Sequence, residues 1–219
     1  MAKKERISNN ALATLAVAAL IVSVAGTMLA VSRGPAFTGF QTGSSNATVQ
    51  FTLQQVASIR FAIATVNFGT GFVNTSAGNT ICILDTNGTN DPAKCRNFTT
   101  VTQGLVLEND GTINVTVSLV SNKNDTAFIG GNDTLNAFRW RVAQNESNSC
   151  GNLTGPTTFV DVNTTAPGTL ICNIFSTGNG GFNFLDAQDT LLIDVNITIP
   201  YDALAGPKNA TLTATGTAV

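Results

Sequence analysis

Apolar and polar residues alternate along four stretches of the chain, and a period of two is the pattern of a β-strand with one buried face. The four stretches are 47–54, 114–120, 190–199 and 209–219. Shorter candidate strands are 57–64, 80–84, 97–106, 137–143 and 168–175. Clusters such as Asn87-Gly88 and Gly130-Gly131 separate these stretches and predict tight turns. The pattern therefore predicts an all-β domain, an antiparallel Ig-like or jelly-roll-like sandwich of about eight to ten short strands.

The same alternation predicts which side chains fill the core. In 137–143, Phe138, Trp140 and Val142 share one face, and Arg139 and Arg141 share the other. We therefore expect Trp140 in the core rather than on a sugar-binding surface, because sandwiches of this kind commonly bury one Trp. Along 190–199 the alternation predicts that four residues face the core: Ile193, Val195, Ile197 and Ile199. It predicts that three face solvent: Asp194, Asn196 and Thr198.

A long apolar segment precedes the alternating body. Residues 11–31 carry no charge, and a helix of 21 residues rising about 1.5 Å per residue can cross a bilayer. The positive charges of Lys3, Lys4 and Arg6 before it predict that the N-terminus stays in the cytoplasm while the rest is exported. The chain is thus expected to comprise a hydrophobic N-terminal α-helix (1–33), a Gly- and Ser-rich linker (34–45) and the β-sandwich domain (46–219).

Two fates of the N-terminal segment remain open. Ser23-Val24-Ala25 has the small residues that a signal peptidase recognises, so the segment can be a cleaved signal peptide. Its apolar length exceeds the usual signal core of about 7–15 residues, which favours a retained membrane anchor or assembly helix. Both fates place the body of the protein outside the cell or on its surface.

The composition narrows the class of function. Charged residues make up 11% of the chain and the net charge is −2, which does not fit a nucleic-acid partner. His is absent, which removes the side chain most used for acid–base chemistry and metal binding near neutral pH. Asn is abundant instead, with 24 residues.

Twelve of the Asn residues stand in Asn-X-Ser/Thr sequons, the acceptor pattern for N-linked sugar. They are Asn46, Asn74, Asn87, Asn97, Asn114, Asn124, Asn132, Asn145, Asn152, Asn163, Asn196 and Asn209. Asn and Thr also form turns and strands, so composition alone yields some sequons. The number and spread of the twelve favour a glycosylated, exported protein, and N-linked glycans are the only non-protein groups expected; no cofactor or metal is.

Four Cys residues form two local pairs, Cys82 with Cys95 and Cys150 with Cys172. Neither pair has the Cys-X-X-Cys spacing of a zinc or redox site. In an exported protein we expect two disulfides that close short loops, each stabilising the fold by about 3 kcal/mol. Three pairings are possible in principle, and four buried free thiols are the alternative.

No arrangement of residues indicates an active site. Without His, a Ser-His-Asp or Cys-His triad is excluded, and no Ser-X-X-Lys occurs. The acidic residues fall mostly in turns, where Asp commonly caps its own backbone. We therefore expect no enzymatic activity. The loop 85–91 places oxygen ligands at alternate positions, as calcium loops do, but it lacks the later Glu of an EF-hand. It is expected to be a plain loop beside the Cys82–Cys95 pair, and a weak external calcium site is the alternative.

Three further stretches stand out: the Asn-X-Gly turn with alternating Val in 107–119, the segment 199–206 before a Thr-alternating last strand, and Val66-Asn67-Phe68-Gly69. They resemble prokaryotic surface domains with an Ig-like sandwich. With the N-terminal apolar segment, the chain is similar to archaeal envelope and pilus-like proteins and, more loosely, to fibre-forming sandwiches of the camelysin/TasA type. It departs from archaeal type IV pilins, because no Lys/Arg-Gly processing motif precedes the apolar run. The resemblance implies a structural role and transfers no functional residue.

The sequence therefore predicts a non-enzymatic structural cell-surface glycoprotein, repeated in an extracellular pilus-like filament or an envelope layer. Its expected partners are copies of itself, and the membrane through the N-terminal helix. If that helix is cleaved, residues 35–54 are expected to add a strand to the open edge of a neighbour. The alternative is a membrane-anchored monomeric adhesin or recognition domain. Under either hypothesis the longest stretch between sequons, 163–196, contains a candidate contact surface at 175–184, which can equally be a flexible loop.

Overall fold

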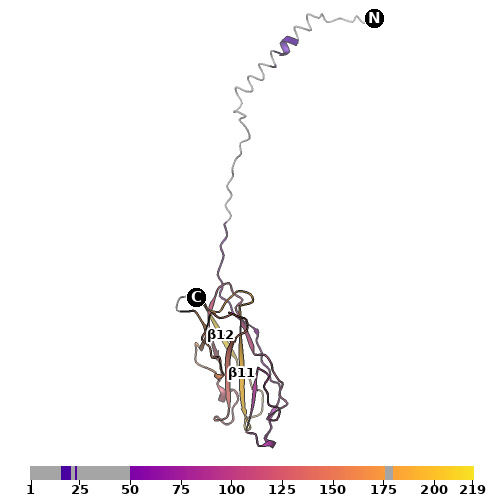
Figure 1. The fold of residues 1–219 in the computed structure, drawn as a ribbon, viewed down its shortest axis with the longest axis vertical. Helices are drawn as coiled ribbons and strands as arrows, with labels where there is room; N and C mark the ends of the chain where they lie inside the picture. Colours follow the sequence, from indigo (N-terminus) through magenta and orange to yellow (C-terminus); the bar gives the residue numbers. More distant parts are fainter. Residues whose placement is uncertain (1–15, 21–22, 24–49, 176–179) are drawn as a thin grey trace, which may run out of the picture. The chain divides into compact units, whose positions relative to one another are not determined.

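The computed structural model describes residues 16–20, 23, 50–175 and 180–219. The chain divides into two units, Met1–Thr52 and Leu53–Val219, and the second carries all of the β-structure described below. Figure 1 shows β11 (Thr190–Pro200) running through the middle of this second unit.

The larger sheet of the described residues is antiparallel and is organised around β11. Its strands follow the order β1-β5-β11-β7-β9, and β3 pairs with β11 as well. The strands other than β11 are β1 (Arg60–Ile63), β3 (Ile81–Asp85), β5 (Leu105–Glu108), β7 (Ala137–Gln144) and β9 (Val160–Asp161). Because β3 pairs with residues 196–200 and β5 with 190–193, these two strands share one edge of β11 end to end.

A second antiparallel sheet has the order β12-β6-β10-β8. Its strands are β6 (Val115–Ser121), β8 (Asn152–Leu153), β10 (Thr169–Asn173) and β12 (Leu212–Ala218). A small antiparallel pair, β2 (Phe72–Val73) with β4 (Cys95–Arg96), forms a separate two-stranded sheet in contact with β3. The helical turns of the domain are η1 (Thr75–Ala77) and α2 (Asp125–Phe128), and Asn124 caps α2 by accepting a hydrogen bond from the Ala127 N–H.

The two sheets face each other across a shared apolar core. Leu107 of β5 and Ile193 of β11 pack in one cluster with Val117 of β6 and Ile171 of β10. Trp140 is 2% exposed in this cluster, which confirms its predicted core position. The alternation of large apolar side chains on the inner faces therefore drives the packing of the two sheets, as in other face-to-face sheet structures. The all-β, antiparallel prediction is confirmed at this level.

Most predicted strands are present, with shifted ends. Those at 57–64, 80–84, 114–120, 137–143, 168–175, 190–199 and 209–219 correspond to β1, β3, β6, β7, β10, β11 and β12. The prediction for 97–106 was wrong over most of its length, because the strand found there, β5, begins only at Leu105. Residues 50–54 of the predicted strand 47–54 are not in a strand, and 47–49 lie outside the described residues.

The predicted orientation of the outer residues of β11 also needs correction. Asp194 and Thr198 point away from the core, as the alternation requires, but they are only 4% and 8% exposed. Asn196 between them is half-buried. Asp194 is covered because loop residues such as Thr86 and Gly104 pack over it, and a side chain on Gly104 would lie 3.0 Å from its carboxylate. A period-two rule predicts the face of a sheet and not what covers that face.

The N-terminal helix is described only in part. Residues 16–20 and residue 23 are helical and exposed, and the rest of the predicted helix 1–33 and the linker 34–45 lie outside the described residues. Within the part of the chain that the structure describes, no helix is long and apolar enough to span a membrane.

Candidate functional site

The two predicted disulfides are confirmed. Cys82 is bonded to Cys95, and Cys150 to Cys172. The first ties β3 to β4, and the second ties the loop before β8 to β10 within the main core. All four cysteines are buried, so both bonds reinforce core packing as well as closing loops. Disulfides of this kind are typical of proteins in an oxidising compartment, which fits export.

The structure places eleven of the twelve sequon asparagines, and none of the eleven is fully buried. Six are exposed: Asn87, Asn97, Asn124, Asn132, Asn145 and Asn209. Five are half-buried: Asn74, Asn114, Asn152, Asn163 and Asn196. Asn46 lies outside the described residues. The sequons are therefore distributed over loops and outer faces of both sheets and do not gather in one site.

Hydrogen bonds divide these asparagines by the state of Nδ2, the atom to which an N-linked sugar is attached. In Asn87, Asn132 and Asn163, Oδ1 accepts the backbone N–H of the residue two positions later, and Nδ2 donates to no described residue. Such Asx-turns fix the side chain and leave the amide nitrogen available. In four others Nδ2 donates a hydrogen bond: Asn74, Asn114, Asn145 and Asn152.

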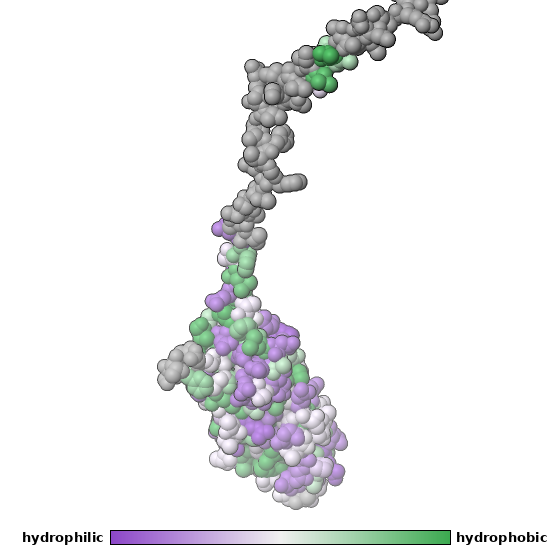
Figure 2. All heavy atoms as spheres, turned by 45° about the horizontal axis from the view of Figure 1, so that its top comes forward, coloured by the Kyte–Doolittle hydropathy of each residue, from purple (hydrophilic) through white to green (hydrophobic). Residues whose placement is uncertain are grey.

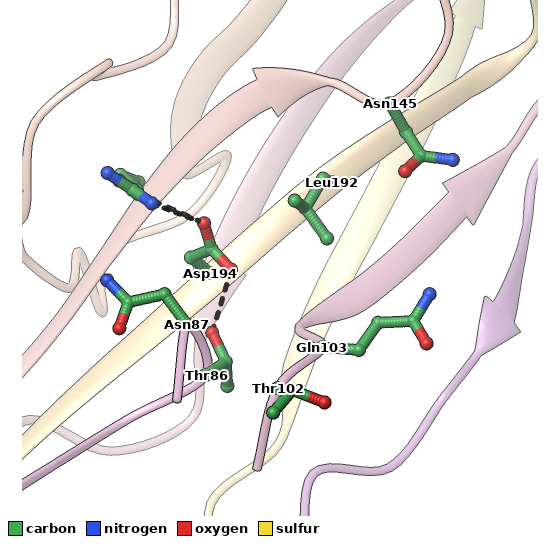
Figure 3. A pocket seen from close by; sticks show the side chains of 8 residues that line it. Thr86, Asn87, Thr102, Gln103, Asn145, Leu192 and Asp194 are labelled. Carbon is green, nitrogen blue, oxygen red and sulfur yellow. Dashed lines mark hydrogen bonds and ion pairs between the residues drawn. The ribbon is translucent and has the colours of Figure 1, made fainter. Parts of the chain in front are cut away.

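A polar pocket lies on the outer face of the larger sheet, with a volume of about 430 Å³. It lies beside the point where β3 and β5 meet along β11, and Figure 3 shows Leu192 and Asp194 of β11 between two loop segments. Thr86 comes from the end of β3, and Thr102 and Gln103 from the approach to β5. These residues are far apart in the sequence and share no motif, so the pocket has no local signal in the sequence.

Asp194 is the most buried charged group of this pocket. Its Oδ2 accepts a hydrogen bond from Arg141 Nε at 3.0 Å and forms an ion pair with Arg141 Nη2 at 2.9 Å. Its Oδ1 accepts a hydrogen bond from Thr86 Oγ1 at 2.8 Å, and Thr86 Oγ1 in turn accepts the Val195 N–H. The Arg141 guanidinium also lies over the ring of Phe159, 4.9 Å from its centre. The charge of Asp194 is thus compensated and its position fixed from two sides.

The acidic loop 85–91 uses its oxygens on its own chain. Both carboxylate oxygens of Asp85 accept hydrogen bonds from Thr89, and Oδ1 also accepts the Asn87 N–H. Asp91 accepts the Ala93 N–H and pairs with Lys94. Within the described residues, no three His, Cys, Asp or Glu side chains are placed to share a metal ion.

Two neighbouring carboxyl groups titrate differently from free ones. Burial raises the pKa of Asp189, and the negative charges of Glu146 and Glu108 raise it further. Burial also acts to raise the pKa of Glu146, but hydrogen bonds, beginning with the Asp189 N–H at 2.9 Å, outweigh it and lower that pKa. The pair thus holds Glu146 ionised and disfavours a second charge on Asp189.

β12 forms one edge of the smaller sheet, and it lacks the features that usually protect an edge. It has no charged residue, no Pro and no bulge, and its register against β6 is continuous over seven residue pairs. Within the described residues, only β6 pairs with it. Natural sheets commonly block such edges with Lys, Pro or bulges, because an open edge can accept another strand.

Apolar side chains are exposed on the segment before β1. Phe51 is 85% exposed, Leu53 83% and Val56 51%. The Val56 N–H donates to Thr112 Oγ1, and its carbonyl accepts the Thr112 N–H. Figure 2 colours each residue by its hydropathy, and the hydrophobic residues of this stretch are green.

The predicted contact surface at 175–184 is described at its two ends. Phe175 is 45% and Phe184 37% exposed, and Leu185 next to it is 52% exposed. Phe182 between them is fully buried in the main core, so this segment contributes to the fold as well as to the surface. Residues 176–179 lie outside the described residues.

Comparisons with known proteins leave these features to be interpreted on their own. No family model, no curated protein and no solved structure matches the chain.

Proposed function

We propose that the protein is a non-enzymatic structural glycoprotein of the cell surface, whose copies assemble into an extracellular filament by adding a strand to one another. The observation that carries the proposal is the open edge of β12. Seven uncharged residues in continuous register present an edge that pairs with no other strand of the described residues, and an edge of this kind is suited to strand addition.

The direction of the backbone groups on β12 supports this assembly. The Asn122 N–H donates to the Thr211 carbonyl at 3.0 Å, one residue pair before β12 begins. Peptide groups alternate in direction along an antiparallel pair. The N–H and C=O groups of Thr213 and Thr215 therefore face β6. The N–H and C=O groups of Ala214 and Gly216 face the open edge, where they are available to a further strand.

The segment 47–54 is suited to supply that strand. Val49, Phe51 and Leu53 alternate with polar residues, and Phe51 and Leu53 expose most of their side-chain surface. Burial of a Phe or Leu side chain contributes about 1.5–3 kcal/mol, so pairing with a neighbouring copy would be favourable. Its eight residues are enough to pair along the seven residues of β12.

The sequons and disulfides favour a surface location. The eleven sequons in the described residues keep their asparagines at least partly exposed, and both disulfides require an oxidising environment to persist. We propose that the domain is an Ig-like or jelly-roll-like sandwich exported behind the apolar segment 1–33, which is either retained in the membrane or cleaved. An envelope layer in place of a filament would use the same edge.

The experiment compares protein from the surface of the producing cell with two variants. Phe51→Ser/Leu53→Ser removes the apolar face of the donor segment, and Thr52→Ser/Gln54→Ser changes its polar face as a matched control. We expect the wild type and the control to form filaments in electron micrographs and to sediment as polymers. The first variant should remain monomeric with unchanged thermal unfolding, as should a deletion of residues 35–54.

Filaments from both the Phe51→Ser/Leu53→Ser variant and the deletion would sink the proposal. A wild type that stays monomeric at high concentration would instead favour the monomeric adhesin. The intact mass tests the glycan part independently: a mass well above 22.7 kDa is expected, and an unmodified mass contradicts it.

A further inference from the structure

Two sequons face the polar pocket on the outer face of the larger sheet. Figure 3 shows Asn87 and Asn145 on opposite sides of it, with Leu192 between them. Both asparagines are exposed, and each begins a sequon. A sugar attached to either one would therefore start at the rim of a cavity of about 430 Å³, within the size range of small-ligand sites.

The pocket offers hydrogen-bonding groups that the protein itself does not use. Arg141 uses Nε and Nη2 on Asp194, and its Nη1 donates to no described residue. The side chains of Thr102 and Gln103 are exposed and have no hydrogen-bond partner among the described residues. Donors and acceptors of this kind match the hydroxyl groups of a sugar.

The charge distribution of the pocket favours a neutral ligand over an anion. Asp194 already compensates Arg141 at 2.9 Å, so an anion would have to compete with a buried carboxylate. The half-buried side chain of Leu192 adds an apolar surface for the C–H face of a sugar ring. A neutral saccharide fits this combination better than a phosphate or sulfate.

The geometry of the two asparagines differs, and it favours Asn87 as the attachment point. Asn145 Nδ2 donates a hydrogen bond to Thr190 Oγ1 at 3.0 Å. Asn87 binds the N–H and hydroxyl of Thr89 through Oδ1, which fixes its side chain, and its Nδ2 donates to no described residue. We propose that the pocket binds the first sugars of a glycan attached to Asn87. These sugars contact Arg141, Gln103 and Leu192 and cover the Arg141–Asp194 pair. This inference rests on the glycoprotein part of the proposed function.

The test measures how accessible the sugar at Asn87 is in the native glycoprotein. Dispersed Phe51→Ser/Leu53→Ser protein is oxidised briefly with hydroxyl radicals, which attack exposed C–H bonds of any sugar, and each glycopeptide is analysed by mass spectrometry. Asn132 is the reference, since it is also exposed, lies in an Asx-turn and leaves Nδ2 free. Two or three hydrogen bonds to the pocket should slow oxidation of the first sugars at Asn87 by about tenfold relative to Asn132. The difference should vanish in denaturant.

A variant identifies the pocket as the cause. Gln103→Trp fills the cavity from an exposed position and should abolish the protection, while Gln144→Trp, at an exposed glutamine that does not line the pocket, should leave it intact. Two results overturn the inference but not the glycoprotein proposal. They are equal oxidation at Asn87 and Asn132 in the native protein, and sugar at Asn132 but not at Asn87. Protection that appears only in filaments also overturns it, because the neighbour then covers the sugar. Sugar at neither site, with an unmodified intact mass, overturns the glycoprotein proposal itself.

Discussion

Thr86 Oγ1 donates a hydrogen bond of 2.8 Å to Asp194 Oδ1 at the point where two strands meet along one edge of β11. β3 pairs with β11 from residue 196 onward and β5 pairs with it up to residue 193, so residues 194 and 195 have no partner strand on that edge. Thr86 fills the gap, because its hydroxyl also accepts the Val195 N–H and its own N–H donates to the Val195 carbonyl. One residue thus completes the hydrogen bonding of an interrupted sheet, and its hydroxyl fixes the buried carboxylate beneath the pocket.

Replacing Thr86 by Val tests this role. The side chain is 1% exposed, and Val keeps its shape while removing the hydroxyl that bonds Asp194 and Val195. Two buried polar groups would lose a partner, so we expect the free energy of unfolding to fall by about 1–3 kcal/mol. Chemical denaturation measures the change, and Thr86→Ser, which retains the hydroxyl, should recover most of it. A Val variant as stable as the Ser variant would contradict the assignment.

The two arginines of β7 provide a matched comparison. Arg141 pairs with Asp194, whose side chain is 5% exposed, whereas Arg139 pairs with Asp161, whose side chain is 73% exposed. Arg141→Met leaves a buried carboxylate without its counter-charge, so we expect the free energy of unfolding to fall by about 1–3 kcal/mol. This loss is smaller than for a fully buried pair because Arg141 is partly exposed. Arg139→Met should change stability by less than about 1 kcal/mol. Equal losses in denaturation experiments would show that burial of Asp194 does not matter.

The strands could be predicted from the sequence where one face is buried by the opposite sheet. β6 and β11 have regular alternation because Val117, Leu119 and Ile193 all pack in the common core. The two disulfides could also be predicted, because each pair is close in the sequence. The segment 97–106 was wrongly predicted as a strand, since its apolar residues Phe98 and Val101 pack from a loop against a second apolar cluster, which contains Leu84 and Ile197.

The pocket could not be predicted, because its position depends on long-range pairing. Thr86 and Asp194 are 108 residues apart, and only the end-to-end placement of β3 and β5 on β11 brings them together. Alternation marks Asp194 as a solvent-facing residue, and nothing near it in the sequence signals the loop that covers it. The sequons were visible in the sequence, but the hydrogen-bonded state of each amide was not.

The Glu146–Asp189 pair predicts a pH-dependent effect. The pKa of Asp189 is raised in the fold, by burial first and then by the charge of Glu146, so its ionisation destabilises the folded state as the pH rises through that pKa. Asp189→Asn removes this charge and should be slightly more stable than the wild type at pH 7, by less than about 1 kcal/mol because the site is partly exposed. The advantage should disappear below about pH 4, where Asp189 is protonated in both states. Thermal unfolding between pH 3 and 7 measures it, and an advantage that is constant or larger at low pH would contradict the assigned direction.

Asn114 should be the least glycosylated of the described sequons. Its Nδ2 donates to the Gly180 carbonyl at 2.9 Å, and its Oδ1 is buried without a partner among the described residues. A sugar on Nδ2 would have to displace the segment at Gly180. We therefore expect Thr116→Ala, which removes this sequon, to leave the intact mass lower only by the residue change. Thr134→Ala, which removes the exposed Asn132 sequon, should also remove the mass of a glycan. Sugar on Asn114 in peptide mapping of the native protein would contradict this prediction.

A charge on the edge strand should prevent assembly without unfolding the domain. Thr215 is an exposed residue of β12, and the residue opposite it on β6 is Ser118, one strand further from the open edge. Thr215→Lys places at the edge the residue that natural sheets use to block strand addition, so we expect polymers to be lost while thermal unfolding is nearly unchanged. Ser118→Lys adds the same charge to the neighbouring strand and should still polymerise. Sedimentation of the two variants at equal concentration distinguishes a requirement for the β12 edge from a general effect of charge. If Thr215→Lys polymerises as the wild type does, assembly does not use this edge. If both variants fail to polymerise, the added charge and not its position is responsible.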